Sequence, residues 1–308
     1  MGSALPHDLR LTEQRNPRTA GIDRLTALEI VEVINSEDRL VAPAVYEERH
    51  AIAKAMELAE SALRAGGSII YVGAGTSGRL GVLDASEMPP TFGTDPTLVQ
   101  GIIAGGAEAV TRAMEGAEDD PAAGAAEIDR RGVGKTDFVL GTATSGTTPF
   151  VHGALDRARA LGATTGFLLC TPPAPELRER YDVVIAPLVG PEVVTGSTRM
   201  KAGTATKLVL NTISTGAMIR TGKVFGNLMI DLRATNLKLQ DRSERILMET
   251  CDVDRDAARA LLARAGGSVK MAMAMHWTGA DLEEAAARLR DAGGRLEGLL
   301  DGRSDDVG

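Results

Sequence analysis

SIIYVGAGTSGRLGVLDASEMPPTF, residues 68–92, is the stretch that decides the fold. It begins with four apolar residues at 69–72, a run typical of a strand that is buried on both faces of a sheet. A turn of glycines and hydroxyl side chains follows at 73–78, and residues 80–86 then predict a short helix that ends before the proline pair at 89–90. A strand, a glycine turn and a helix start in this order predict a site for a phosphorylated ligand, because the N–H groups of such a turn bind anions.

Further runs of the same kind place this first strand in a sheet. Four more apolar runs of strand length follow it, at 99–104, 138–141, 166–169 and 183–186. Helical patterns separate most of these runs, for example at 107–118 and 149–161. Strands that alternate with helices predict an α/β fold with a five-stranded parallel sheet covered on both faces. Ligands bind such open sheets at the carboxyl ends of the strands, which is where the glycine turn lies.

The remainder of the chain is predicted to be mainly helical. Residues 1 to about 25 form an irregular polar arm, and Thr26 with Glu29 makes a capping box at the start of the next helix. A longer helix follows Pro43 and ends at Gly66.

The region after the last strand is also helical in pattern. A polar turn from Gly190 leads into a long helix, and a second helix is predicted from about Asn227 to Leu239. Asp254 and Asp281 are predicted N-caps of two shorter helices in a small terminal domain.

Composition excludes several classes of partner. The net charge of −8 argues against nucleic acid. The two cysteines, Cys170 and Cys251, both lie in apolar surroundings, which predicts reduced, buried thiols and no metal site. The first ten residues lack the apolar core of a secretory signal, and no run approaches the roughly 20 apolar residues that span a membrane. These features predict a cytoplasmic protein with no membrane partner.

The glycine turn permits two interpretations. Residues 73–78 match G-x-G-x-x-G, the dinucleotide fingerprint, but the second strand ends at 104–106 without the acid that would hold a ribose. We therefore expect no nicotinamide, flavin or other cofactor. A second loop at 142–149, TATSGTTP, follows the third strand and again precedes a helix. Two such loops predict a monophosphate site, although the same hydroxyls could be ordinary helix caps. The predicted phosphate-binding residues are Gly75, Thr76, Ser77, Gly78, Thr144, Ser145, Gly146, Thr147 and Thr148.

General acid and base chemistry is assigned to carboxylates by elimination. None of the four histidines lies in a glycine-rich turn; they are His7, His50, His152 and His276. Glu87 follows the first loop by a few residues, and further acids cluster at 114–120, where the helix after the second strand is expected to end. Acids at a helix C-terminus oppose the helix dipole, which favours a functional purpose over a structural one. A solvated acidic turn is the alternative.

Three segments carry a resemblance to a known family. LGVLDASEMPPTFG (80–93), IIAGGAEAVTRAMEGAEDD (102–120) and GPEVVTGSTRMKAGTATK (190–207) closely resemble N-acetylmuramic acid 6-phosphate etherases. The third segment is shared mainly with glucokinase regulatory proteins. The resemblance implies a sugar isomerase (SIS) domain, an αβα sandwich, followed by a small helical domain like the ubiquitin-associated (UBA) domain. With this reading, residues 1–48 are the arm and first helix, 49–240 the SIS domain and 241–308 the helical domain.

The resemblance also implies an activity. The family consists of cytoplasmic homodimers that need no metal and act on a small-molecule sugar phosphate. They are carbon–oxygen lyases that cleave the lactyl ether of N-acetylmuramate 6-phosphate to N-acetylglucosamine 6-phosphate and D-lactate during cell-wall recycling. Carried over to this sequence, the catalytic acids are Glu87 and Glu118, and Glu115 is a neighbour with no catalytic role.

The sequence departs from the family pattern at three positions, and two other functions stay open. Thr147 stands where the family usually has an arginine, Met88 where it has a cysteine, and Leu237 where it has an acid. Neither catalytic acid is lost. The alternatives are a non-catalytic sugar-phosphate-binding regulatory protein and a sugar-phosphate isomerase built on the same fold.

Overall fold

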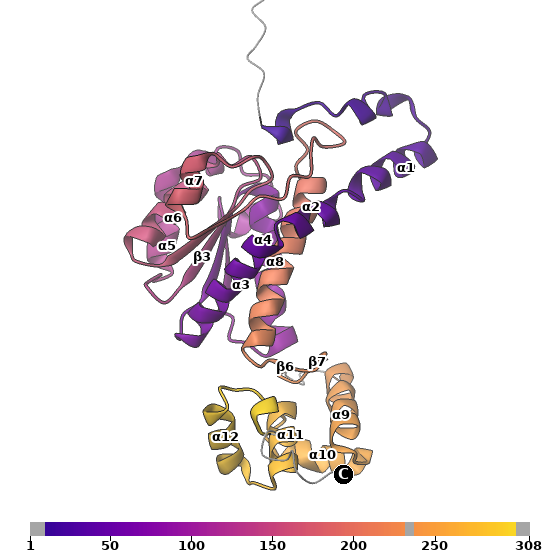
Figure 1. Cartoon of the computed structure of the whole chain (residues 1–308), viewed down its shortest axis with the longest axis vertical. Helices are drawn as coiled ribbons and strands as arrows, with labels where there is room; N and C mark the ends of the chain where they lie inside the picture. The colour runs from indigo at the N-terminus through magenta and orange to yellow at the C-terminus, as the bar shows by residue number, and fades with distance from the viewer. Residues whose placement is uncertain (1–9, 232–236, 300–308) are drawn as a thin grey trace, which may run out of the picture. The chain divides into compact units, whose positions relative to one another are not determined.

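The computed structural model describes residues 10–231 and 237–299 of the chain, excluding the side chains of Leu237 and Lys238. The chain divides into two compact units. The first comprises residues up to 85 together with 97–214, and the second comprises 86–96 together with the chain from 215 onward. Helices α4 (Gly75–Phe92) and α8 (Lys201–Arg220), both labelled in Figure 1, are each divided between the two units at residues 85/86 and 214/215. The domain boundaries expected at 48/49 and 240/241 stay a prediction.

The first unit is built on the predicted five-stranded parallel sheet, with the strand order β2-β1-β3-β4-β5. Its strands are β1 (Ile69–Gly73), β2 (Val99–Ile103), β3 (Phe138–Thr142), β4 (Thr164–Leu168) and β5 (Val183–Ile185). Every residue of β1 and β3 is buried, which confirms that their apolar runs lie between two covered faces. The α/β fold class is therefore confirmed.

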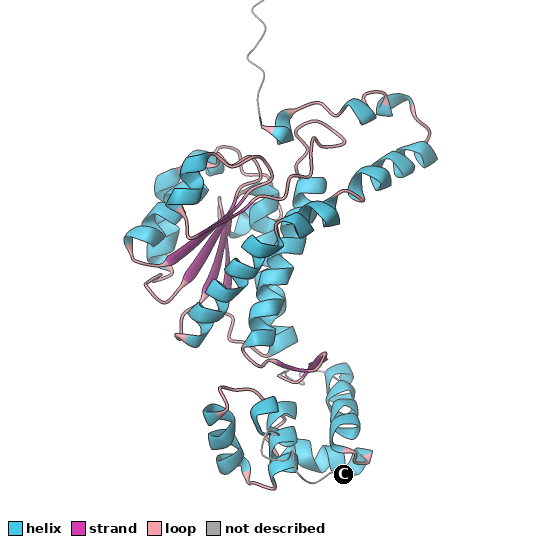
Figure 2. Cartoon of the chain, viewed as in Figure 1, coloured by secondary structure: helices cyan, strands magenta, loops and turns pink. Residues whose placement is uncertain are grey.

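Helices cover both faces of this sheet (Figure 2). Helices α5 (Pro121–Arg130) and α6 (Pro149–Ala160) pack on one face, where Ile70 and Val72 meet Phe150 in one apolar core. Helix α7 (Pro175–Arg180) lies against β5. On the other face, α3 (Arg49–Arg64) contacts β1 and β3, and Gly81 of α4 rests against the Tyr71 side chain.

The segment before the sheet follows the predicted pattern in part. The polar arm contains three short 3-10 helices, η1 (Leu11–Glu13), η2 (Pro17–Thr19) and η3 (Ile22–Arg24). The capping box of Thr26 and Glu29 is confirmed at the start of α1 (Ala27–Asp38). Helix α2 (Val41–Glu47) precedes α3.

The helix after the first glycine turn is longer than predicted. Expected at 80–86 and ended by prolines, α4 in fact begins at Gly75 and continues through Pro89 and Pro90 to Phe92. The φ angle of proline, near −65°, fits a helix, so the two prolines remove ladder N–H groups without forcing the chain out of the helix. The expectation that they end the helix was wrong.

The prediction of a helix at 107–118 was also wrong. Two short 3-10 helices occupy this region, η4 (Ala107–Val110) and η5 (Ala117–Asp119), separated by a loop in which Gly116 has φ +73°. Asp120 then caps the helix that was missed, α5, by accepting a hydrogen bond from the N–H of Ala123 at 3.0 Å. The acids at 114–120 therefore precede a helix N-terminus, and the dipole argument that placed them at a C-terminus does not hold.

The segment that follows α8 differs from the predicted helix. The structure has a hairpin of β6 (Val224–Phe225) and β7 (Leu228–Met229) where a helix was expected from Asn227. Gly226, with φ +54°, forms the turn. Residues 232–236 lie outside the described residues, and α9 (Leu237–Cys251) follows them.

The terminal helices of this unit are confirmed. They are α10 (Arg255–Arg264), α11 (Val269–Thr278), α12 (Leu282–Asp291) and the short η6 (Glu297–Leu299). Asp254 and Asp281 each accept the predicted capping hydrogen bond. Leu247, Met273 and Ala285 are fully buried at the centre of their common core.

Candidate active site

A cavity of about 500 Å³ lies at the carboxyl ends of β1 and β3. The two strands are neighbours, and the strand order reverses between them, since β2 lies on one side of β1 and β3 to β5 lie on the other. Loops separate at such a reversal, which makes it the usual ligand site of an open parallel sheet. The cavity has the size of a typical small-molecule site. Its lining residues are Arg10, Glu13, Ala74, Gly75, Thr76, Ser77, Glu118, Asp119, Thr142, Ala143, Thr144, Ser145, Thr147, Thr148, Pro149, Gly196 and Thr198.

The structure brings the two predicted phosphate loops to this one cavity. Residues 75–78 of the first predicted loop form the first turn of α4, whereas the second loop precedes the N-terminus of α6. Both helices therefore direct the positive ends of their dipoles toward the loops. The predicted residues in the lining are Gly75, Thr76, Ser77, Thr144, Ser145, Thr147 and Thr148. That these residues bind phosphate stays a prediction.

The other two predicted residues, Gly78 and Gly146, are not in the lining, and both support the loops. A Cβ atom at Gly78 would come within 2.6 Å of the Ile103 side chain and 2.8 Å of the Gly73 carbonyl oxygen. Glycine at this position lets α4 approach the ends of β1 and β2. Gly146 has φ +80°, a left-handed conformation that glycine adopts at little cost, and it forms the turn of the second loop.

One histidine does contact a predicted loop, although all four had been set aside. His152 of α6 makes hydrogen bonds through Nε2 to the carbonyl oxygen of Gly146 at 2.9 Å and through Nδ1 to the hydroxyl of Tyr181 at 3.0 Å. It is partly buried and packs at 5.1 Å against the ring of Phe167. The criterion that a useful histidine must lie within a glycine-rich turn missed it, because His152 follows Gly146 by six residues and belongs to the next helix. We interpret His152 as a support of the loop.

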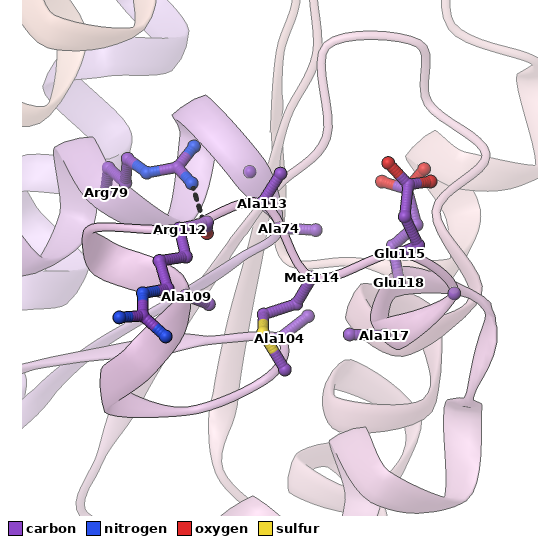
Figure 3. A pocket seen from close by; sticks show the side chains of 12 residues that line it. Ala74, Arg79, Ala104, Ala109, Arg112, Ala113, Met114, Glu115, Ala117 and Glu118 are labelled. Atoms are coloured by element: carbon purple, nitrogen blue, oxygen red, sulfur yellow. Dashed lines mark hydrogen bonds between the residues drawn. The ribbon is translucent and has the colours of Figure 1, made fainter.

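Glu118 is the predicted catalytic acid that lies in the cavity wall. It is exposed, belongs to η5, and also lines a smaller cavity of about 190 Å³. Glu115 lines the smaller cavity, and Figure 3 shows the two carboxylates projecting to the same side of the segment that carries them. Arg79 of α4 holds this segment through two hydrogen bonds. Its Nε donates to the carbonyl oxygen of Val110 at 2.9 Å. Its Nη2 donates to the carbonyl oxygen of Arg112 at 3.0 Å, the bond drawn in Figure 3.

Glu87, the other predicted acid, lies elsewhere on the chain. It is an exposed residue of α4 in the part assigned to the second unit, whereas Glu118 belongs to the first. Among the described residues it is not in the lining of the larger or the smaller cavity. Its neighbour Met88 is buried, with 4% exposure. The side chain of Leu237, the third departure from the family pattern, lies outside the described residues.

Sequence reasoning missed part of the cavity wall. Arg10 and Glu13 come from the N-terminal arm, and Gly196 and Thr198 come from the polar turn that precedes α8. Thr142, the last residue of β3, is only 2% exposed and lines the cavity, and its hydroxyl has no hydrogen-bond partner among the described residues. Thr142 was quoted as part of the second loop, but the arm carried no local signal of a role in the site.

A buried charged cluster joins the arm to the start of α8. The carboxylate of Glu37 accepts hydrogen bonds from Lys201 Nζ at 2.7 Å, from Asn16 Nδ2 at 2.9 Å and from the guanidinium of Arg18. The Glu37 and Lys201 side chains are 3% and 0% exposed. Hydrogen bonds from Arg18 lower the pKa of Glu37 to about 2, with further support from Lys201 and Asn16 against the effect of burial. Glu37 is therefore ionised at neutral pH.

A second buried acid, Glu192, lies near the start of the polar turn that precedes α8. Glu192 accepts hydrogen bonds from the N–H groups of Lys201 at 3.0 Å and Ala202 at 2.9 Å. Burial raises its pKa, and these N–H groups oppose that effect. A carboxylate on the first N–H groups of α8 satisfies donors that a helix leaves unpaired. Segment 190–207 thus has a structural use: Glu192 fixes the turn that supplies Gly196 and Thr198 to the cavity.

No group of three or more His, Cys, Asp or Glu side chains is arranged to hold a metal ion in the part of the chain that the structure describes. Within the same residues, no helix combines the length and the apolar character needed to cross a membrane. Both cysteines are free and buried, as predicted.

Comparisons with known proteins identify the family. Residues 51–159 match the model of the glucokinase regulatory protein N-terminal SIS domain, which confirms the SIS-type sheet. A solved phosphoheptose isomerase from Neisseria gonorrhoeae is similar with a TM-score of 0.47 at 18% identity, over 62% of this chain and 98% of that one. An N-acetylmuramic acid 6-phosphate etherase from Serratia proteamaculans (strain 568) is 51% identical over 94% of this chain and 97% of its own length. The N-acetylmuramic acid 6-phosphate etherase of Gloeobacter violaceus is 54% identical over 98% of both chains. At this identity over almost its whole length, the chain belongs to the N-acetylmuramic acid 6-phosphate etherase family.

Proposed function

We propose that this protein is an N-acetylmuramic acid 6-phosphate etherase, a carbon–oxygen lyase of the hydro-lyase class. Its products would be N-acetylglucosamine 6-phosphate and D-lactate. The observation that carries the proposal is the 54% identity over 98% of the chain to a relative of that name. A cavity of about 500 Å³ between two loops rich in hydroxyl groups and N–H donors supports a phosphorylated sugar as the ligand.

The chemistry of the substrate defines what the site must supply. Opening the sugar ring makes C1 an aldehyde, and the aldehyde acidifies the hydrogen on C2. A carboxylate removes that proton, the C3–O bond breaks, and a second acid protonates the departing lactate oxygen. Water then adds to the resulting double bond and places its oxygen on C3. The two acids must hold opposite protonation states at the start of the reaction.

We assign the two proton transfers to Glu118 and Glu87. Glu118 is the proposed base at C2, which is supported by its place in the wall of the cavity beside the first phosphate loop. Glu87 is the proposed donor to the lactate oxygen, an assignment that rests on the family resemblance of its DASE segment. The two loops would bind the phosphate, so that binding energy from the far end of the sugar aligns C2 and C3 with the acids.

The experiment that tests the function is a product assay. The protein is incubated with N-acetylmuramate 6-phosphate in H₂¹⁸O, and D-lactate and N-acetylglucosamine 6-phosphate are measured. We expect lactate release with ¹⁸O on C3 of the sugar product, because water adds to C3; label on C1 is uninformative, since the aldehyde oxygen exchanges with water. Label in the lactate would instead indicate hydrolysis at the lactyl carbon and exclude the lyase mechanism. Binding without any product would favour a regulatory protein, and a ketose product would favour an isomerase.

A set of variants tests the residues. Glu118→Gln and Glu87→Gln should each lower kcat by about 10²–10⁴-fold, the usual contribution of a positioned acid or base. Glu115→Gln is the matched control, since Glu115 lies three residues from Glu118 and lines only the smaller cavity. Retention of near-full turnover by both single variants would show that the carboxylate assignment is wrong. Loss of activity in Glu115→Gln alone would move the base to that residue.

The location of the protein, its oligomeric state and its domain boundaries belong to the same proposal. We propose a cytoplasmic homodimer with a SIS domain at 49–240 and a helical domain at 241–308. A surface for a second copy is supported by α1, where Leu28 and Val31 are 68% and 61% exposed. Light scattering of the purified chain, with Val31→Glu as the variant, tests the dimer.

A further inference from the structure

The charges around the larger cavity are unusual for a site that takes a phosphate. Its lining contains three acids, Glu13, Glu118 and Asp119. Among the described residues, Arg10 is the single lysine or arginine in that lining. The two loops contribute hydroxyl groups and N–H donors, which carry no net charge. Within the described lining, Arg10 is therefore the cationic side chain with which a dianionic phosphate can pair.

The position of Arg10 places its charge at the second loop. Arg10 Nη1 lies 3.5 Å from the Oγ1 atom of Thr147. The Thr147 hydroxyl in turn lies 3.1 Å from the Ser145 hydroxyl, and the N–H of Thr147 also donates to Ser145 Oγ at 3.4 Å. Arg10 thus adds a guanidinium to the group of donors that the loop already presents. Thr147 is the position at which the resembled family usually has an arginine.

The arm holds Arg10 in this place through hydrogen bonds to two other segments of the chain. The N–H of Leu11 donates to the hydroxyl of Thr171 at 3.3 Å, and the carbonyl oxygen of Thr12 accepts from the N–H of Gly196 at 3.2 Å. Thr12 is 1% exposed. The residues that follow Arg10 are therefore fixed to the protein, and the arm is a wall of the cavity.

We propose that Arg10 binds the phosphate group of the substrate and supplies the positive charge that this chain lacks at Thr147. The inference rests on the proposed function, because it takes the ligand to be a sugar phosphate. A guanidinium suits this purpose, since its N–H donors match the geometry of phosphate oxygens and its charge persists at every working pH. Arg10 is a binding and specificity residue: it selects phosphorylated over unphosphorylated sugars and takes no part in proton transfer.

The test compares Arg10→Gln with Arg15→Gln, an exposed arginine of the same arm that does not line the cavity. For Arg10→Gln we expect KM for N-acetylmuramate 6-phosphate to rise about 10- to 100-fold, the usual effect of losing a hydrogen bond to a charged group. The value of kcat should change little, because the contact is equal in ground state and transition state. Arg15→Gln should match the wild type in both constants.

A double variant that moves the positive charge from Arg10 to position 147 completes the test. In the double variant Arg10→Gln/Thr147→Arg, a guanidinium is supplied by residue 147 of the second loop in place of Arg10. The KM of this variant should fall most of the way back to the wild-type value. An unchanged KM in Arg10→Gln would overturn the inference, and so would a raised KM that Thr147→Arg fails to lower.

A calorimetric titration separates this inference from the proposed function. N-acetylglucosamine 6-phosphate and N-acetylglucosamine are each titrated into the wild type and Arg10→Gln, which requires no turnover. If the wild type binds only the phosphorylated sugar and Arg10→Gln loses that preference, the inference stands even where no lactate is released. If lactate is released and both proteins prefer the phosphorylated sugar equally, the role of Arg10 is refuted and the proposed function stands. A wild type that neither binds sugar phosphate nor releases lactate would refute both proposals.

Discussion

Glu37→Gln is the perturbation whose magnitude follows most directly from the structure. The carboxylate is 3% exposed and pairs with Lys201, which is fully buried, at 2.7 Å. Its pKa falls from an ordinary value of 4.5 to about 2, first through hydrogen bonds from Arg18 and then through those of Lys201 and Asn16. That difference corresponds to about 3 kcal/mol of stability at neutral pH. Breaking a buried ion pair by removing one partner costs a similar amount, about 3–5 kcal/mol.

We therefore expect Glu37→Gln to lower the free energy of unfolding of the first unit by about 3 kcal/mol at pH 7. Its melting temperature should fall by about 6–12 °C, the shift typical of a unit of this size. The pH dependence has a definite sign. A carboxyl group whose pKa is lowered by folding adds stability above its unfolded pKa, and this contribution is lost as the pH falls from about 5 to 2. The variant and the wild type should therefore converge at low pH.

The assay must follow the first unit. Trp277, the one tryptophan of the chain, belongs to the second unit, so its fluorescence reports on that unit. Amide hydrogen exchange of peptides from 27–38 and 201–214 reports on the two helices that the cluster joins. The double variant Glu37→Leu/Lys201→Met removes both buried charges and should regain most of the lost stability. A loss below about 1 kcal/mol in Glu37→Gln would refute the reasoning, since a surface pair contributes no more than that.

Three further predictions concern the loops and the core. Gly78→Ala should lower the melting temperature by several degrees, because its Cβ would lie 2.6 Å from the Ile103 side chain and 2.8 Å from a backbone oxygen; an unchanged melting curve would contradict the tight packing. Arg79→Gln should lower kcat about 10-fold with little change in KM, because it releases the segment that carries Glu118. In steady-state kinetics, the kcat of Arg79→Lys should lie between those of the wild type and Arg79→Gln. An unaltered kcat in both variants would argue against this positioning role. Burial raises the pKa of the Cys170 thiol to about 12, so a thiol reagent should label Cys170 at about pH 8 only in denaturant, as mass spectrometry would show.

The sequence alone determined the parts of this protein whose signals are local. The apolar run at 69–72 predicted a buried strand because a strand covered on both faces must be apolar throughout. The two glycine and hydroxyl loops were predicted as one site because parallel strands present their carboxyl ends at the same edge of a sheet. Caps such as Asp254 were found because the capping side chain lies three residues from the N–H that it accepts.

Local pattern failed where backbone freedom or distant contacts decide. Gly116, with a positive φ, interrupts the helix expected at 107–118, and α4 continues through its two prolines because their fixed φ is compatible with a helix. Arg10 and Thr147, 137 residues apart, meet only after the arm has been fixed beside the sheet. The same holds for Glu37 and Lys201, which are 164 residues apart. Periodicity records which side of an element is buried, but it contains no record of which distant segment covers that side. The sequence thus determined the sheet and the two loops at its carboxyl edge, whereas the wall that carries Arg10 was decided by the tertiary structure.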